Sequence, residues 1–222
     1  MDRDVTIVLG KTGYGKSLWT SLYTCKLDRL LVYDLMREHY VTYFDPQVLA
    51  DQINALEPDD EIEKFRIGLA DPDLVPGLGH LSFHFGNNLL VLEELSTLFP
   101  KGARMPDWLR TLVFLGRHKK CSLLAVAQRA YSVPIDLRSQ ANRVVTFQQH
   151  EGDDLSWLRE FYGSAIVHQI PNLPKLCCYD YHDGNVTVYS IAYSVKKQLG
   201  INLMMEDSEK MFVLRKEVSD YA

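Results

Sequence analysis

The feature that most constrains the fold is the segment GKTGYGKS at residues 10–17, which fits the pattern G-x-x-x-x-G-K-[ST]. It follows an apolar run at residues 4–9 (DVTIVL) and precedes a stretch with apolar residues at helical spacing at 17–27. This strand, loop and helix order is the context that the pattern requires. Residues 10–17 therefore predict a phosphate-binding loop in which backbone N–H groups and the amino end of a helix face one anion.

Individual residues of the loop have distinct expected roles. Glycines at 10, 13 and 15 let the backbone curl, Lys16 reaches the β and γ phosphates of a nucleotide, and Ser17 offers an oxygen to Mg²⁺. ATP and Mg²⁺ are thus the expected ligands. The predicted nucleotide-binding residues are Gly10, Thr12, Gly13, Tyr14, Gly15, Lys16 and Ser17.

Strand and helix patterns alternate along the chain. This alternation predicts an α/β fold with a mostly parallel sheet and helices on both faces. Together with the phosphate loop at 10–17, it makes a P-loop NTPase of the RecA type the expected fold class. Residues 71–79 (DPDLVPGLG) are expected to form a loop. The expected strands lie at 4–9, 30–34, 65–69, 88–92, 122–127 and 144–148, and the expected helices at 17–27, 47–56, 107–115 and 153–162.

Beyond Gly163 the pattern changes. Two strands at 176–181 and 185–192 flank His-Asp-Gly at 182–184, a strong hairpin signal. We therefore divide the chain into an ATPase core, residues 1–163, and a hairpin with a C-terminal extension, residues 164–222, packed on that core. The stretch from Lys196 onward is only weakly predicted.

Composition limits the class of protein. No window reaches about 18 consecutive apolar residues, so we expect no membrane span, and the amino terminus does not read as a secretory signal. The four cysteines have no metal-like spacing and predict reduced, intracellular thiols. Net charge is −5, which argues against a general nucleic-acid coat.

Charge is nevertheless unevenly distributed. Residues 45–100 contain eleven acids and two bases, whereas residues 101–143 contain nine bases and two acids. An anionic polymer would therefore meet the second stretch. Solvated surface charge is an equally good reading of such a run.

Three further motifs indicate catalysis. The run LLVLEE at 89–94 is a buried strand that ends in two acids, with Glu93 expected near the metal and Glu94 expected to polarise the attacking water. A later strand ends at Gln128, which could sense the γ phosphate. Arg117 precedes that strand and is a candidate arginine finger acting on a neighbouring subunit, with Arg129 and Arg138 as rivals.

Together, the motifs GKTGYGKS, LLVLEE and GRHKKCSLLAVAQRAYS resemble the FtsK–HerA superfamily of DNA-pumping ATPases over about residues 4–149. Within that superfamily the short chain looks most like the genome-packaging ATPases of tailless, membrane-containing viruses. In this superfamily a glycine-arginine segment precedes a strand that ends in glutamine. One departure is Glu93, because members usually carry an aspartate at that position.

The resemblance implies a set of roles. Lys16 and Ser17 would contact nucleotide and Mg²⁺, Glu94 would act as base, Gln128 as sensor and Arg117 as a finger in trans. It also implies a homo-oligomeric ring, expected to be hexameric, that moves double-stranded DNA in the host cytoplasm or with the virion, docked on a capsid or membrane protein. The basic side chains that could line a central channel are Lys101, Arg104, Lys119 and Lys120.

Other classes remain open on the sequence alone. A nucleotide or small-molecule kinase also uses a phosphate loop, but no arginine-rich lid is evident. A Zot-type phage assembly ATPase shares the loop and the domain size. A nucleotide-gated binding module without DNA is the third alternative, and the basic stretch counts only mildly against it.

Overall fold

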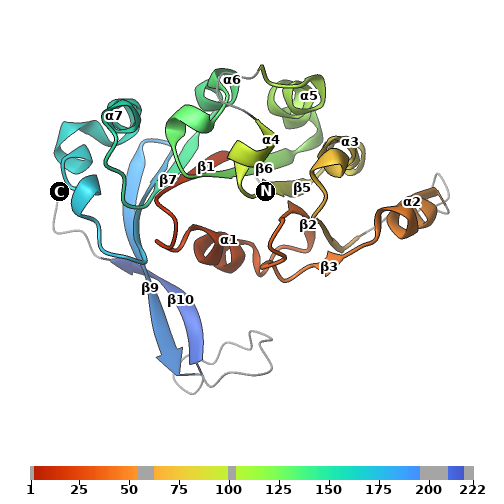
Figure 1. Cartoon of the computed structure of the whole chain (residues 1–222), viewed down its shortest axis with the longest axis horizontal. Helices are drawn as coiled ribbons and strands as arrows, with labels where there is room; N and C mark the ends of the chain where they lie inside the picture. Colours follow the sequence, from red (N-terminus) through yellow and green to blue (C-terminus); the bar gives the residue numbers. More distant parts are fainter. Residues whose placement is uncertain (1–2, 55–62, 100–103, 196–209, 218–222) are drawn as a thin grey trace.

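A computed structural model of the chain describes residues 3–54, 63–99, 104–195 and 210–217 (Figure 1). Most of the predicted strands are present within one or two residues of the expected bounds. The elements are β1 (Val5–Leu9), α1 (Lys16–Thr24), β2 (Arg29–Tyr33), β3 (Thr42–Tyr43), α2 (Pro46–Asn54), β4 (Phe65–Leu69), η1 (Pro72–Leu74), α3 (Val75–Phe85), β5 (Asn88–Leu92), α4 (Leu95–Leu98), α5 (Asp107–Leu115), η2 (Gly116–Lys119), β6 (Cys121–Ala127), η3 (Ala130–Ser132), α6 (Ile135–Ser139), β7 (Arg143–Thr146), α7 (Gly152–Val167), η4 (Ile170–Asn172), β8 (Cys177–His182), β9 (Asn185–Val195) and β10 (Lys210–Glu217).

In the described residues these strands form one sheet with the order β10-β9-β8-β7-β1-β6-β5-β2-β4-β3. The strands from β7 to β3 in this order pair in parallel, whereas β8, β9 and β10 extend the sheet by antiparallel pairing. The carboxyl ends of β1, β6, β5 and β2 therefore meet at one edge. This arrangement confirms the predicted α/β fold.

Two apolar cores, one on each face, explain why the parallel strands are continuous apolar runs. In β1, Ile7 faces the core beneath α3, α5 and α7, and Val8 faces the core that contains Trp19 of α1. Figure 1 shows the same division, with α1 on one side of the sheet and α3, α5, α6 and α7 on the other.

The prediction of a loop at 71–79 was wrong, because α3 begins at Val75. Pro76 is tolerated there, since the first turn of a helix has no N–H that must be satisfied internally. Gly79 lies against Trp108 of α5, where a Cβ would be 2.3 Å from the indole ring. The glycine that resembles a turn signal therefore permits close packing of two helices.

The predicted hairpin is present. Asp183 and Gly184 have φ angles of 47° and 86°, as the two central residues of a type I′ turn require. Strand β9 continues to Val195 and pairs with β10, and the two project away from the helical layers (Figure 1). Residues 196–209 and 218–222 of the predicted extension lie outside the described residues, as do the last residues of the helix expected at 47–56.

Candidate functional site

Residues 10–15 connect β1 to α1 as a tightly curled loop, and Lys16 and Ser17 begin the helix. Gly13 and Gly15 have φ angles of 79° and 107°, which residues with a Cβ rarely adopt. A Cβ at Gly15 would also lie 2.8 Å from the side chain of Leu176, which precedes β8. Glycine at 15 is therefore needed both for the backbone conformation and for the approach of the C-terminal hairpin.

Lys16 opens α1, and only 6% of its surface is exposed. Its Nζ donates a hydrogen bond to the carbonyl oxygen of Lys11 at 3.4 Å. Burial lowers the pKa of Lys16, and the carboxylates of Glu94 and Glu93 act in the opposite direction. The ammonium group is thus held inside the loop, close to the two acids.

A cleft of about 370 Å³ lies in front of the loop. Two of the predicted residues, Gly10 and Tyr14, are not among those that line it: Gly10 packs on Phe147, and the Tyr14 ring faces Lys175. The predicted residues that do line it are Thr12, Gly13, Gly15, Lys16 and Ser17 from the loop, and Glu93 and Glu94 from the end of β5.

Glu93 and Glu94 lie in different environments although they are adjacent. Glu93 is 4% exposed, and burial raises its pKa, while a hydrogen bond from His39 acts in the opposite direction. Glu94 is partly exposed and adopts a left-handed conformation, with φ 48° and ψ 56°, where the chain leaves β5 for α4. The sharp turn presents both carboxylates to one cleft.

A third acid, Asp34, lines the cleft at the end of β2, and no motif pointed to it. Its carboxylate accepts hydrogen bonds from the backbone N–H groups of Met36 (2.9 Å), Glu38 (2.6 Å) and His39 (3.2 Å) and from the Tyr43 hydroxyl (2.8 Å). These bonds use both oxygens. Asp34 is therefore a structural acid that shapes the segment 34–39.

The donor set suits Mg²⁺. Hydroxyl and carboxylate oxygens are the ligands that this ion prefers, and Ser17 and Glu93 supply one of each at the same cleft. In the part of the chain that the structure describes, no group of three or more His, Cys, Asp or Glu side chains is arranged to hold a metal alone. Such a site fits an ion bound partly by nucleotide phosphates, as Mg²⁺ commonly is.

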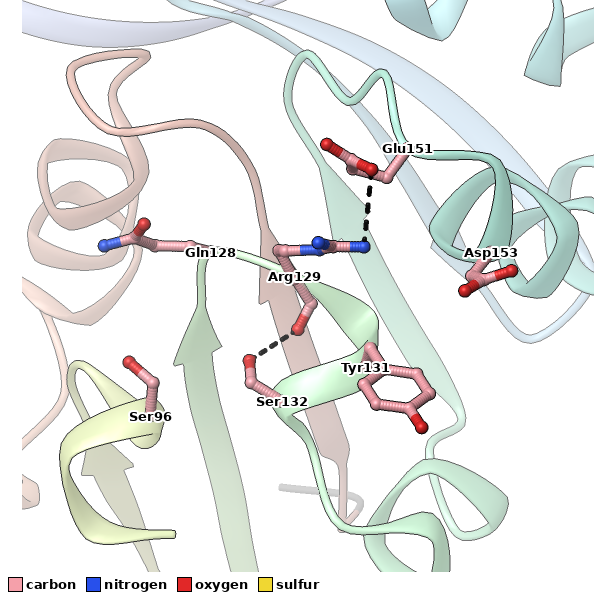
Figure 2. Close-up of a pocket in the computed structure, with 7 residues that line it drawn as sticks. All are labelled: Ser96, Gln128, Arg129, Tyr131, Ser132, Glu151 and Asp153. Atoms are coloured by element: carbon pink, nitrogen blue, oxygen red, sulfur yellow. Dashed lines mark hydrogen bonds and ion pairs between the residues drawn. The ribbon is translucent and has the colours of Figure 1, made fainter. Parts of the chain in front are cut away.

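Gln128 lies at the carboxyl end of β6 but lines a second pocket of about 550 Å³. Figure 2 shows its side chain pointing away from Arg129 and Glu151. The backbone carbonyl oxygen of Gln128 accepts a 2.7 Å hydrogen bond from Nε2 of buried Gln149. Arg129, one of the rival fingers, forms ion pairs with Asp154 (3.1 Å) and Glu151 (3.7 Å) within its own chain.

Arg117 lies at the amino ends of the parallel strands, on the side of the sheet opposite the phosphate loop. It precedes β6 in η2, whereas the phosphate loop follows the carboxyl end of the parallel neighbour β1. Seven strand residues span roughly 23 Å at about 3.3 Å each, too far for the side chain to reach its own cleft. Arg117 is exposed, and its Nε lies 3.4 Å from Nε2 of His118.

Several basic residues of the stretch 101–143 pair with acids in the same chain, and others are exposed. Arg110 pairs with Asp136, and Arg143 pairs with Asp180, so these charges are compensated within the fold. A rival finger, Arg138, is partly buried beside Trp157. Of the predicted channel residues, Arg104, Lys119 and Lys120 are exposed, while Lys101 lies outside the described residues.

The phosphate loop, the parallel strand order and the acids at the end of β5 define the fold of a P-loop NTPase. The fold is similar to that of the genome packaging NTPase B204 from Sulfolobus turreted icosahedral virus 2, solved with ATP-gammaS. The two chains are 16% identical with a TM-score of 0.66, covering 84% of this chain and 96% of B204.

Two further solved structures share the fold. The conjugation coupling protein TcpA of pCW3 is 15% identical with a TM-score of 0.54, over 85% of this chain and 60% of TcpA. VirB4 of Thermoanaerobacter pseudethanolicus is 13% identical with a TM-score of 0.52, over 82% and 87% of the two chains. With identities of 13–16%, these similarities show a shared fold, which is the fold that the resemblance to FtsK–HerA ATPases predicts.

No protein-family model and no curated protein sequence matches the chain. None of the described helices has both the length and the apolar character needed to cross a membrane.

Proposed function

We propose that the chain is a Mg²⁺-dependent ATPase that moves double-stranded DNA, and that its task is packaging a viral genome. The observation that carries the proposal is the cleft in which Lys16 and Ser17 of the phosphate loop face Glu93 and Glu94. A phosphate loop opposite acids at the end of a buried strand is the arrangement that nucleoside triphosphate hydrolysis requires.

Each side chain has a distinct task in this proposal. The loop N–H groups and Lys16 bind the β and γ phosphates, and Ser17 with Glu93 holds Mg²⁺, which neutralises charge on the phosphates when bound. Glu94 orients the attacking water and accepts its proton. Gln128 lies one strand from the loop, where it responds to loss of the γ phosphate through the end of β6.

The location of Arg117 supports a ring. Because Arg117 is too far from its own cleft, a catalytic role requires the cleft of a second copy, and head-to-tail contacts of this kind form a ring when the rotation between subunits closes. The same proposal includes a ring of six subunits and a docking protein on a capsid or membrane. It also includes a location in the host cytoplasm or in the virion.

DNA binding is proposed from exposed basic side chains and from the kinds of protein that share the fold. Arg104, Lys119 and Lys120 are exposed and suited to contact phosphates without reading sequence. The solved structures with this fold include a genome packaging NTPase and a conjugation coupling protein. The proposal places these three residues along the path of the duplex.

The ATPase is tested by measuring release of inorganic phosphate from ATP by the purified chain, with Mg²⁺ and with excess EDTA. We expect phosphate release that needs Mg²⁺ and no added acceptor, and loss of release in Lys16→Ala, because the buried ammonium is removed from the phosphates. Lys64→Ala, which removes an exposed lysine paired with Asp28, is the matched control and should hydrolyse normally.

Phosphate transfer that appears only with an added acceptor would instead identify a kinase. Nucleotide binding without any hydrolysis would favour the nucleotide-gated binding module.

A further inference from the structure

A buried contact beside the cleft has no part in the roles assigned so far. Nε2 of His39 lies 2.9 Å from Oε1 of Glu93, and the two side chains are 1% and 5% exposed. Water therefore does not compete for this hydrogen bond. A polar contact in such surroundings fixes geometry more firmly than one at the surface.

The segment that carries His39 is built to bring it back to the sheet edge. Strands β2 and β5 pair in parallel with Tyr33 opposite Leu92, so Asp34 and Glu93 follow on adjacent strands. The chain leaves the edge at Asp34, turns around its carboxylate, and returns at His39, whose own N–H is bound to Asp34 at 3.2 Å. The imidazole position is thus set by the backbone.

Packing alone does not account for a histidine here. A carboxylate that holds Mg²⁺ is ionised and only accepts, so with Glu93 in that proposed role the ring hydrogen of His39 is assigned to Nε2. The other ring nitrogen, Nδ1, is then buried without a hydrogen-bond partner among the described residues. An unpaired buried nitrogen destabilises the fold, and an apolar side chain of similar shape would avoid this penalty.

We infer that His39 is a positioning residue for Glu93, holding Oε1 so that the other carboxylate oxygen is aimed at the Mg²⁺ site. The inference rests on the proposed function, because it assumes a metal role for Glu93. His39 itself contacts neither nucleotide nor metal in this assignment. Glutamate has several rotatable side-chain bonds, and a hydrogen bond to one oxygen restricts them, as outer partners do for ligands in other metal sites.

The test is the Mg²⁺ concentration that gives half-maximal binding of a fluorescent ATP analogue, with half-maximal hydrolysis measured in parallel. His39→Phe keeps the ring shape and removes the hydrogen bond, so we expect it to raise this concentration about 10- to 100-fold, as loss of an outer partner typically does. His39→Gln retains an N–H donor and should recover part of the loss.

A matched control comes from a second histidine–carboxylate contact. Nε2 of His182 lies 3.1 Å from Oδ1 of Asp4, at the edge of the sheet opposite the cleft. His182→Phe removes a bond of the same kind and should leave the Mg²⁺ midpoint unchanged. Thermal unfolding of each variant verifies that the comparison is made between folded chains.

The double variant separates positioning from a general structural effect. In a Glu93→Gln background, His39→Phe should produce no further shift, because the carboxylate on which it acts is gone. A folded His39→Phe chain with the wild-type Mg²⁺ midpoint would overturn the inference, and so would an equal shift in both backgrounds.

Failure of the proposed function gives a different result. If the wild-type chain binds the analogue in a Mg²⁺-dependent way but never hydrolyses ATP, the ATPase proposal fails and the binding midpoint still decides the role of His39. If Mg²⁺ has no effect on binding in the wild type, the metal role of Glu93 and the inference fail together.

Discussion

Replacing Glu94 with glutamine is expected to leave ATP binding intact and to slow hydrolysis by about 10²- to 10⁴-fold, the usual contribution of a general base. Glu94 lines the same cleft as Lys16, and its partly exposed carboxylate can accept a proton from water. The amide has nearly the same shape but cannot do so. Single-turnover hydrolysis and nucleotide binding, measured on the same preparation, test this expectation.

Glu151→Gln is the matched control for Glu94→Gln. Glu151 is exposed and lines the neighbouring pocket beside Arg129, so its replacement makes the same chemical change outside the nucleotide cleft. We expect hydrolysis close to that of the wild type. Turnover retained in Glu94→Gln would show that the base is another group, and Glu93 would then be the first to examine.

The second large effect is expected from Arg117→Ala. An arginine supplied to a neighbouring site contributes about 10³- to 10⁵-fold to the rate of phosphoryl transfer. Because Arg117 lies at the sheet edge opposite its own cleft, nucleotide binding by the isolated subunit should not change. Hydrolysis by the assembled protein should fall, as measured by steady-state phosphate release.

Mixing two inactive variants tests whether Arg117 acts between subunits. An Arg117→Ala subunit retains an intact cleft, and a Lys16→Ala subunit retains Arg117, so mixed assemblies should contain some competent sites and recover activity. Lys64→Ala, which removes an exposed base with no role in the proposal, provides the control. Full activity of Arg117→Ala alone would exclude a catalytic role for this residue, and mixtures that recover nothing would contradict its action in trans.

Much of the fold could be predicted because the parallel strands are short, continuous apolar runs separated by strong turn signals. The hairpin could also be predicted, because Asp183 and Gly184 are residue types that accept the positive φ angles of its turn. Helix α3 could not be predicted in the same way. Pro76 and Gly79 look like loop residues until the packing of Gly79 on Trp108 is known.

The candidate site was predictable where a motif and a strand end coincide. Lys16, Ser17, Glu93 and Glu94 line one cleft, as expected from residues that follow neighbouring parallel strands. His39 could not be found, because it lies six residues beyond the end of β2 in an irregular segment, and only the turn around Asp34 returns it to Glu93.

The role of a residue at a strand end also depends on the direction of its side chain, which the sequence does not specify. Gln128 follows β6 as predicted, yet it lines the adjacent pocket. Arg129 looked available as a finger, but a buried acid, Asp154, binds it within the chain. Side-chain direction and ion pairing across α7 and η3 are tertiary features that residue order does not specify.

ATP hydrolysis by the purified chain, with and without long double-stranded DNA and at low and moderate salt, tests the proposed DNA-moving ATPase most directly. Contacts to DNA phosphates release bound counterions, so their effect weakens steeply as salt rises. The proposal predicts hydrolysis that DNA stimulates at low salt and stimulates less at moderate salt. Hydrolysis that is the same with and without DNA at both salt concentrations would contradict coupling to DNA. Only the ATPase part of the proposal would then remain supported.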